Sequence, residues 1–388
     1  MRNKKPLGIY LHIPFCVRKC NYCDFLSAPA QEEVRRRYVQ CLTEEIRRFD
    51  KADEYEVKSV FFGGGTPSIL DGGEIAALME ELEKKFSFAE IPEITIECNP
   101  GTLTPEKLGI YRGCGINRLS LGLQSADENE LRLLGRIHTW EDFYRNYEQA
   151  REREYTNINV DLMSALPGQT ASSWQKTLQK VLALGPEHIS AYSLIIEEGT
   201  PFYDWYGGVD ESRVRGRESA DSTILPSEEE EREMYYETKR LLAQSGYHRY
   251  EISNYAKPGY ECIHNSGYWL RREYAGFGLG AASQIKDLRY KNAEKLENYL
   301  KGDFSKEEMQ TLTKQEKIEE TMYLGLRMMQ GVSLQDFEKS FGVPMETLYK
   351  ETLEKLQRQG LLQIKDGRLQ LTDLGIDVSN AVMAEFLL

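Results

Sequence analysis

The chain has 388 residues and a formal net charge of −13, and 40% of its residues are hydrophobic. It is long enough for a large core and a second, smaller domain, and its acidic balance argues against nucleic acid as a partner. The N-terminal segment lacks the pattern of a signal peptide, and no run of about 18 apolar residues occurs, so we expect no integral membrane segment.

From residue 7 to about residue 193, short apolar runs alternate with amphipathic stretches. The runs indicate parallel strands that are covered by helices. We expect strands at residues 8–13, 59–62, 94–97, 118–121, 158–162 and 189–193, and helices near 32–50, 73–86, 104–113, 127–134, 140–154 and 171–184. Six successive β/α units predict an α/β fold, a partial TIM barrel of the (β/α)6 type, although periodicity alone leaves a closed eight-unit barrel open.

The second half of the chain has a different character. Residues 206–233 are polar and are expected to form a solvated excursion before a helix at about 229–244, and residues 247–283 give no local assignment. From about residue 306 we expect helices at 314–330, 334–341 and 345–359, a hairpin over 361–371 that turns at Asp366-Gly367, and a last helix from Thr372. This order is similar to a winged helix, for which we favour a packing or interaction role. We therefore divide the chain into a core domain with an extension, 1–290, and a C-terminal α+β domain, 306–388.

Three of the seven cysteines, Cys16, Cys20 and Cys23, form a C-x3-C-x2-C cluster directly after the first expected strand. In a barrel of this type, that loop lies on the face where active sites form. Thiolates suit iron–sulfur clusters or zinc, but a structural zinc site closes with four ligands, and no fourth cysteine is near in the sequence. A zinc site with a distant fourth ligand and three buried thiols without a metal are the alternatives. Free thiols in a chain without an export signal indicate the cytoplasm.

Polar residues and glycines also stand at the ends of the other expected strands. Gly64, Gly65 and Thr66 follow the second strand, where glycines let a ligand approach closely and offer N–H groups to an anion. Further along the chain are Glu97, Gln124, Arg136 and Asp161. Each of these four alone fits an ordinary helix cap or salt bridge, but together they predict one polar binding site at the mouth of the barrel.

The cysteine spacing, with Tyr22 just before the third cysteine, resembles the signature of the radical S-adenosylmethionine (radical SAM) superfamily. The resemblance implies that the cysteines hold a [4Fe–4S] cluster whose open iron binds the amino and carboxylate groups of S-adenosylmethionine, which on reduction yields a 5′-deoxyadenosyl radical. It also implies an S-adenosylmethionine site made of Tyr10, Gly64, Glu97, Gln124, Arg136 and Asp161, with Tyr22, Gly65 and Thr66 beside them.

Nearly the whole chain resembles the oxygen-independent coproporphyrinogen III oxidase family of that superfamily. The decarboxylating members carry a cysteine two residues after the third cluster cysteine, where this chain has Phe25. The segment His264-Asn265-Ser266-Gly267-Tyr268-Trp269 instead resembles the H-N-x-x-Y-W motif of the haem chaperones (HemW). That resemblance implies haem binding, with His264 as a candidate iron ligand and Tyr268 and Trp269 as candidate ring contacts. A core histidine with two packing aromatic residues is the alternative.

The leading hypothesis is therefore a cytoplasmic haem carrier on a radical SAM scaffold. It would bind haem, the cluster and S-adenosylmethionine, and would pass haem to an acceptor apoprotein without a need for substrate turnover. The rival hypothesis is an enzyme, which would decarboxylate the propionates of coproporphyrinogen III by a radical reaction and release protoporphyrinogen IX. Phe25 argues against the rival.

Overall fold

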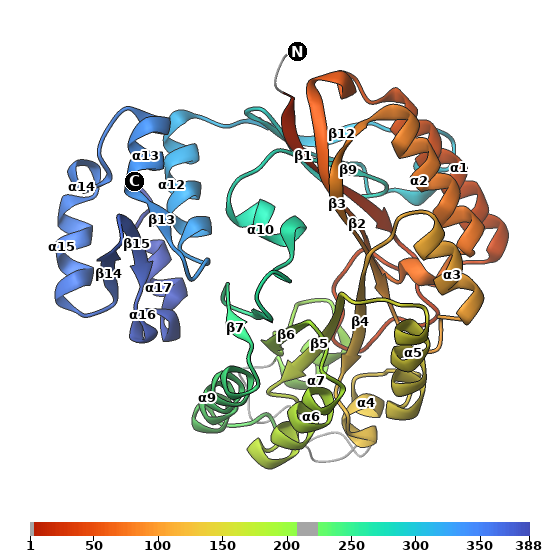
Figure 1. Ribbon diagram of the computed structural model, residues 1–388, viewed down its shortest axis with the longest axis horizontal. Coiled ribbons are helices and arrows are strands. Elements are labelled where there is room, and N and C mark those ends of the chain that lie inside the picture. Colours follow the sequence, from red (N-terminus) through yellow and green to blue (C-terminus); the bar gives the residue numbers. More distant parts are fainter. Residues whose placement is uncertain (1–3, 208–223) are drawn as a thin grey trace.

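Six parallel strands in chain order form the middle of one large sheet in the computed structural model, which describes residues 4–207 and 224–388 (Figure 1). The strands are β1 (Lys5–Ile13), β2 (Tyr55–Gly64), β3 (Ser87–Cys98), β4 (Arg118–Gln124), β5 (Ile158–Ser164) and β6 (His188–Ser193). The helices between them are α1 (Glu32–Arg48), α2 (Gly72–Lys85), α3 (Pro105–Gly113), α4 (Glu128–Leu133), α5 (Trp140–Glu152) and α6 (Ala171–Leu184). The expected β/α alternation is confirmed.

The sheet is open at both ends. Beyond β1 it continues with β9 (Tyr274–Phe277), which is parallel to β1, and then with β10 (Ala282–Ile285), β11 (Leu288–Asn292) and β12 (Lys306–Thr311). Beyond β6 it continues with the antiparallel strands β8 (Asn254–Ala256) and β7 (His248–Arg249). Since β12 and β7 are its two edges in the described residues, the fold is the partial six-unit barrel and not a closed eight-unit one.

Buried strand residues and helix caps explain why these segments fold as they do. In β1, Leu7, Ile9 and Leu11 are almost completely buried and alternate with less buried positions. Thr139 caps α5 by accepting a hydrogen bond from the Asp142 N–H at 3.1 Å. This part of the chain also contains the long helix α9 (Glu228–Gln244) and shorter helical segments: 3-10 turns at Ala52–Glu54 and Pro67–Ile69, α7 (Pro201–Tyr206) and α11 (Leu296–Tyr299).

The C-terminal residues form a unit with a hydrophobic core of its own, which includes Met322, Leu353, Leu369 and Phe386. Its helices are α12 (Lys314–Gly325), α13 (Leu334–Phe341), α14 (Met345–Leu348), α15 (Lys350–Arg358), α16 (Asp373–Asp377) and α17 (Ser379–Ala384). Its small antiparallel sheet has the order β13 (Val332–Ser333), β15 (Arg368–Leu371), β14 (Leu362–Lys365). The expected hairpin is present, and both Asp366 and Gly367 have the positive φ angles that its turn requires.

Four expectations for the second half need correction or restriction. The last helix, expected from Thr372, is divided into α16 and α17 at Val378. The helix expected over 314–330 ends at Gly325, and the Met329 N–H bonds to the carbonyl of Tyr250 at 2.9 Å instead of continuing the helix. The helix expected over 345–359 is split into α14 and α15 at Tyr349, a buried residue whose hydroxyl donates to the Phe386 carbonyl at 3.0 Å. Most of the expected excursion, residues 208–223, lies outside the described residues.

The segment without a local assignment, 247–283, contains α10 (Ile263–Trp269), which lies between the large sheet and the C-terminal unit (Figure 1). The Glu93 carboxylate on β3 accepts hydrogen bonds from the Ile263 and His264 N–H groups, each at 2.9 Å. A buried carboxylate from a remote strand therefore holds the start of this helix. None of the helices in the described ranges combines the length and the apolar character needed to cross a lipid bilayer.

Candidate functional site

A cavity of about 390 Å³ opens at the carboxyl ends of the parallel strands, where the loops that follow them meet. Eleven of the twelve residues predicted for the cluster and S-adenosylmethionine line it: Cys16, Cys20, Tyr22, Cys23, Gly64, Gly65, Thr66, Glu97, Gln124, Arg136 and Asp161. Residues far apart in the sequence are thus brought to one place, as is typical of ligand sites on this kind of barrel.

The cysteine loop follows β1 and crosses the mouth of the cavity. Cys16 is buried, while Cys20 and Cys23 are half-buried, and all three thiols are free. The Cys16 N–H bonds to the Ala28 carbonyl and the Cys23 N–H to the Cys20 carbonyl, both at 3.3 Å, so the loop has a defined shape. Burial raises the pKa of Cys16 and of Cys23, and metal binding at this loop would therefore have to release protons.

The donor set fits an iron–sulfur cluster better than a single metal ion. In the described ranges, no three His, Cys, Asp or Glu side chains are grouped so that they could hold one ion. In a cubane each cysteine binds a different iron, so the sulfurs need not converge on one point. Arg136 adds positive charge beside the loop, with its Nη1 donating to Cys20 Sγ at 3.6 Å. Its buried Nε has no hydrogen-bond partner among the described residues and remains available to a negatively charged group.

Glycine is needed at the end of β2 because the chain that leads into the cysteine loop lies close to the backbone there. A Cβ on Gly65 would lie 2.5 Å from the carbonyl oxygen of Phe15, and the Gly65 N–H donates to the Ile13 carbonyl at 2.9 Å. Gly64 has a φ of 114°, and a Cβ there would lie 2.7 Å from the His12 ring. These two positions therefore allow the backbone to pass close to the residues that lead into Cys16.

Glu97 is the next-to-last residue of β3, and its side chain lines the same cavity. Its Oε2 accepts a hydrogen bond from the Gly64 N–H at 3.2 Å. Burial, and next the nearby Asp161 carboxylate, raise the pKa of Glu97 to about 8. With no ligand bound, this side chain is mostly protonated at neutral pH. A ligand ammonium group next to it would favour the ionised form.

The pH dependence of stability gives a test of this environment. In the folded chain Glu97 keeps its proton up to about pH 8, whereas in the unfolded chain it loses the proton near pH 4.5. The contribution of Glu97 to the free energy of unfolding is therefore fully present below pH 4.5 and decreases as the pH rises to about 8. Between pH 5 and pH 8, the unfolding free energy of the wild type should therefore fall relative to that of Glu97→Gln. The exposed Glu106→Gln serves as the control, and its curve should stay parallel to that of the wild type. Parallel wild-type and Glu97→Gln curves in urea denaturation would contradict the assignment.

Asp161 on β5 and Gln124 on β4 are fixed by hydrogen bonds to residues of β4, β5 and β6. Asp161 accepts hydrogen bonds from Ser120 Oγ at 2.9 Å and from Asn159 Nδ2 at 2.8 Å. Gln124 has a φ of 70°, which is rare for a residue other than glycine, and it accepts a hydrogen bond from the Tyr192 hydroxyl at 2.9 Å. Backbone strain of this kind is often found at ligand sites, because a tightly bonded surrounding is needed to maintain it.

The sequence prediction missed two residues that organise the cavity. Asn99 donates to Thr66 Oγ1 and accepts from Arg136 Nη2, both at 2.8 Å, so it links the glycine loop to the arginine. Tyr192 lies in the cavity wall and holds Gln124. Both follow the rule used for the other residues, since Asn99 comes directly after β3 and Tyr192 lies at the end of β6.

The remaining predicted residues lie elsewhere. Tyr10 does not line the cavity: its hydroxyl contacts His12 Nδ1 at 3.1 Å, and its ring lies near Phe61 and His264. His264 is 3% exposed, with Nδ1 paired to Ser59 Oγ at 3.0 Å and Nε2 paired to the Tyr268 hydroxyl at 2.9 Å. Burial lowers the pKa of His264 to about 3. Iron ligation by His264 would require one of these hydrogen bonds to break, and its role, like those of Tyr268 and Trp269, stays a prediction.

Comparison with known proteins agrees with this geometry. The family description "Radical SAM superfamily" matches residues 10–181, and "HemN C-terminal domain" matches residues 312–378. The chain is 35% identical to the haem chaperone HemW of Lactococcus lactis, over 99% of this chain and 98% of the relative. It is 36% identical to that of Bacillus subtilis, over 97% and 98%. The structure of the coproporphyrinogen III oxidase HemN of Escherichia coli, a radical SAM enzyme, matches with a TM-score of 0.83 and 25% identity, over 99% of this chain and 90% of the other.

The partial barrel, with a C-x3-C-x2-C loop and a polar cavity at the ends of its strands, is that of a radical SAM protein. Within that superfamily, the near-complete match to several curated relatives shows that the chain belongs to the HemW family of haem chaperones. The family implies a [4Fe–4S] cluster and S-adenosylmethionine as cofactors, and the residues in the cavity fit both.

Proposed function

We propose that this chain binds haem and transfers it to an acceptor apoprotein, and that it uses the radical SAM site for a purpose other than porphyrinogen decarboxylation. The observation that carries the proposal is the identity of 35% to a haem chaperone over nearly the whole length of both chains. The similarity includes the C-terminal unit as well as the domain that would hold the cofactors. It therefore supports the same function for the entire protein.

The cavity around the cysteine loop supports the cofactor assignment residue by residue. Cys16, Cys20 and Cys23 would hold the cluster, and Arg136 would balance its negative charge. Residues 64–66 and Glu97 would face the amino end of S-adenosylmethionine, and Gln124 and Asp161 would bind its adenosine part by hydrogen bonds. When bound and reduced, the cluster would supply the electron that radical SAM proteins pass to S-adenosylmethionine.

Phe25 is the feature that separates a carrier from a decarboxylase. It lines the cavity next to the cysteine loop, and 62% of its surface is exposed. A phenyl ring cannot donate a proton or an electron pair to a substrate, whereas a cysteine at that position can. Decarboxylation is the second candidate function, because the chain shares the fold of HemN and that fold could accept the same substrate.

We further propose that the protein works in the cytoplasm. All seven cysteines are free in the structure, and an oxidising compartment would favour their loss to disulfides. A site that assembles an iron–sulfur cluster from thiolates also needs reducing conditions.

One anaerobic experiment decides between the two functions. Reconstituted protein is given coproporphyrinogen III, S-adenosylmethionine and a reductant, and the products are separated by chromatography, while haem binding is titrated on the same preparation. We expect saturable haem binding and no protoporphyrinogen IX. Rapid formation of protoporphyrinogen IX would overturn the carrier assignment, and a preparation without haem binding would refute it independently.

A further inference from the structure

A second cavity, of about 660 Å³, lies between the end of α10 and the C-terminal unit. Trp269, Leu270 and Arg271 form its wall on the side of the large sheet, and residues of α12, α13 and β15 form the opposite wall. It is larger than the cavity at the cysteine loop, and it falls within the range of about 300–1,000 Å³ that small-molecule sites occupy. The cluster and S-adenosylmethionine are assigned to the other cavity, so no ligand has yet been assigned to this one.

The charge of this cavity differs from that of the chain as a whole. Its lining contains four basic side chains, Arg271, Lys314, Lys317 and Arg368, and one acidic side chain, Asp336. The net charge of the chain is −13, so a basic lining is not explained by composition. It is the type of surface that binds a negatively charged ligand.

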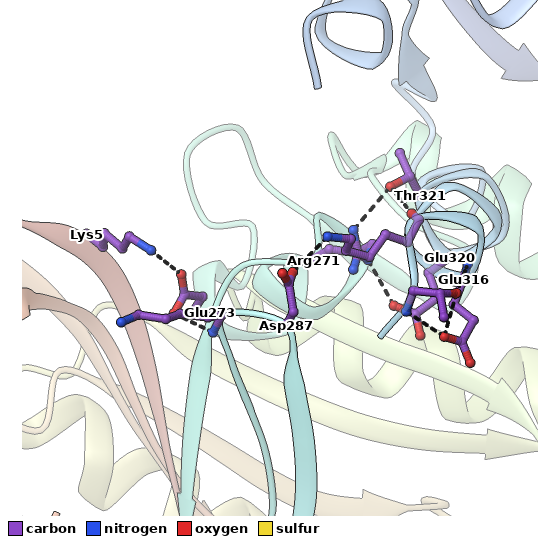
Figure 2. A network of polar contacts seen from close by, with 10 residues as sticks. Lys5, Arg271, Glu273, Asp287, Glu316, Glu320 and Thr321 are labelled. Atoms are coloured by element: carbon purple, nitrogen blue, oxygen red, sulfur yellow. Dashed lines mark hydrogen bonds and ion pairs between the residues drawn. The ribbon is translucent and has the colours of Figure 1, made fainter. Parts of the chain in front are cut away.

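Two of the four cations already have carboxylate partners. Arg271 reaches from the end of α10 to α12, where its Nε donates to Glu320 at 2.9 Å and its Nη1 contacts Thr321 Oγ1 at 3.4 Å (Figure 2). Lys317 is paired with Asp287 at 2.9 Å. These pairs join the sheet side to the C-terminal unit and so fix the cavity walls.

The other two cations are not neutralised. Within the described residues, Arg368 donates to backbone carbonyls and to no carboxylate; the carbonyls are those of Gln330 at 2.7 Å and Gly331 at 2.8 Å. Lys314, the first residue of α12, is exposed and has no hydrogen bond or ion pair to any residue that the structure describes. A ligand with two carboxylates could therefore pair with both without displacing a protein carboxylate.

The rest of the lining is mixed, with the hydroxyl side chains Thr321, Ser333 and Ser340 beside several apolar and aromatic residues. Phe337 and Phe341 lie with their ring centroids 4.9 Å apart, and Trp269 stands on the opposite wall. Trp269 Nε1 is buried without a hydrogen-bond partner in the described part of the chain, so a polar group of a ligand would find a donor there. The Arg327 guanidinium lies 4.3 Å from the centroid of the Trp269 ring and adds positive charge beside it. The cavity thus combines an aromatic wall with two cations that have no carboxylate partner among the described residues.

We propose that this cavity binds the tetrapyrrole, with its ring against Trp269 and its propionate carboxylates paired with Lys314 and Arg368. The proposal rests on the haem-carrier function and places its ligand. No histidine, cysteine, methionine or tyrosine is among the described residues that line the cavity. Recognition here therefore uses the propionates and the ring and not the iron, and metal-free protoporphyrin IX binds as haem does.

The test compares two lysines at the same helical position. Lys314 and Lys350 are both exposed first residues of helices in the C-terminal unit, but only Lys314 lines the cavity. Full-length wild type, Lys314→Glu and Lys350→Glu are titrated with haem and with protoporphyrin IX, followed by absorbance and by porphyrin fluorescence. Glutamate is favourable in a first helical turn, so both variants should fold, and circular dichroism checks that they do.

We expect Lys314→Glu to weaken the binding of both ligands about tenfold, and Lys350→Glu to stay within about twofold of the wild type. The dimethyl ester of protoporphyrin IX, which lacks both charges, should bind the wild type more weakly than the free acid by at least about tenfold. Unchanged affinity in Lys314→Glu, or equal affinity for the ester, overturns this site while the carrier function stands. Absence of haem binding in the wild type refutes the carrier function itself.

Discussion

Replacement of Cys20 by alanine is expected to abolish assembly of the [4Fe–4S] cluster. Two thiolates cannot hold a cubane that needs three protein ligands, and Cys20 is also the thiol that contacts Arg136. Iron and sulfide bound after anaerobic reconstitution should fall from about four per chain to near zero. The measurement is a colorimetric assay of both elements, combined with the visible absorption spectrum.

Cys114→Ala is the matched control for that substitution. Cys114 is also half-buried and free, but it lies at the end of α3, where its thiol contacts the Tyr111 carbonyl at 3.2 Å. We expect this variant to bind as much iron as the wild type. Equal iron in the Cys20 and Cys114 variants would show that the thiols of the loop do not hold the cluster.

Replacement of Glu93 by alanine is expected to lower the free energy of unfolding by about 3–5 kcal/mol. The side chain is 6% exposed and accepts hydrogen bonds from two N–H groups at the start of α10. It also stabilises the charge of buried Arg118: although burial alone would lower the pKa of this arginine, the nearby Cys262 and Glu93 raise it. Alanine would leave the buried His264 N–H and the partly buried Ile263 N–H without their acceptor, and it would remove a negative charge that compensates Arg118.

Glu90→Ala tests whether the loss is specific, because Glu90 lies on the same strand but is exposed. Its expected change is within about 0.5 kcal/mol, as for most surface substitutions. Urea denaturation of both variants at one pH gives the comparison. A loss below about 1 kcal/mol for Glu93→Ala would mean that α10 is held in place by other contacts.

The sequence predicted the strands best where a run of neighbouring residues is buried. The central strands carry apolar residues on one face, such as Leu119, Leu121 and Leu123 in β4, and the sequence located the centre of each strand from β1 to β6. The early part of β2 was missed because Glu56 and Lys58 interrupt the apolar pattern with side chains that remain half-exposed. The early part of β3 was missed because the exposed Glu90 and the proline at position 92 interrupt it in the same way. Strand pairing with neighbours, which no local pattern records, extends the strands to Tyr55 and Ser87.

The sequence predicted those residues of the site that lie at the ends of strands. Glu97, Gln124 and Asp161 lie on or at the ends of apolar strands, and parallel strands bring such residues to one edge. The surroundings of His264 could not be predicted, since its partner Ser59 is 205 positions away in the sequence. The cavity beside α10 was equally hidden, because its walls come from two units with separate cores.

Electron paramagnetic resonance of the reconstituted and reduced wild-type protein, recorded before and after addition of S-adenosylmethionine, is the most direct test of the central claim. With three cysteines on the cluster and one iron open, we predict the signal of a reduced [4Fe–4S] cluster and a change in that signal when the ligand binds the open iron. A protein that shows no such signal, or that carries zinc in the cysteine loop, would contradict the account.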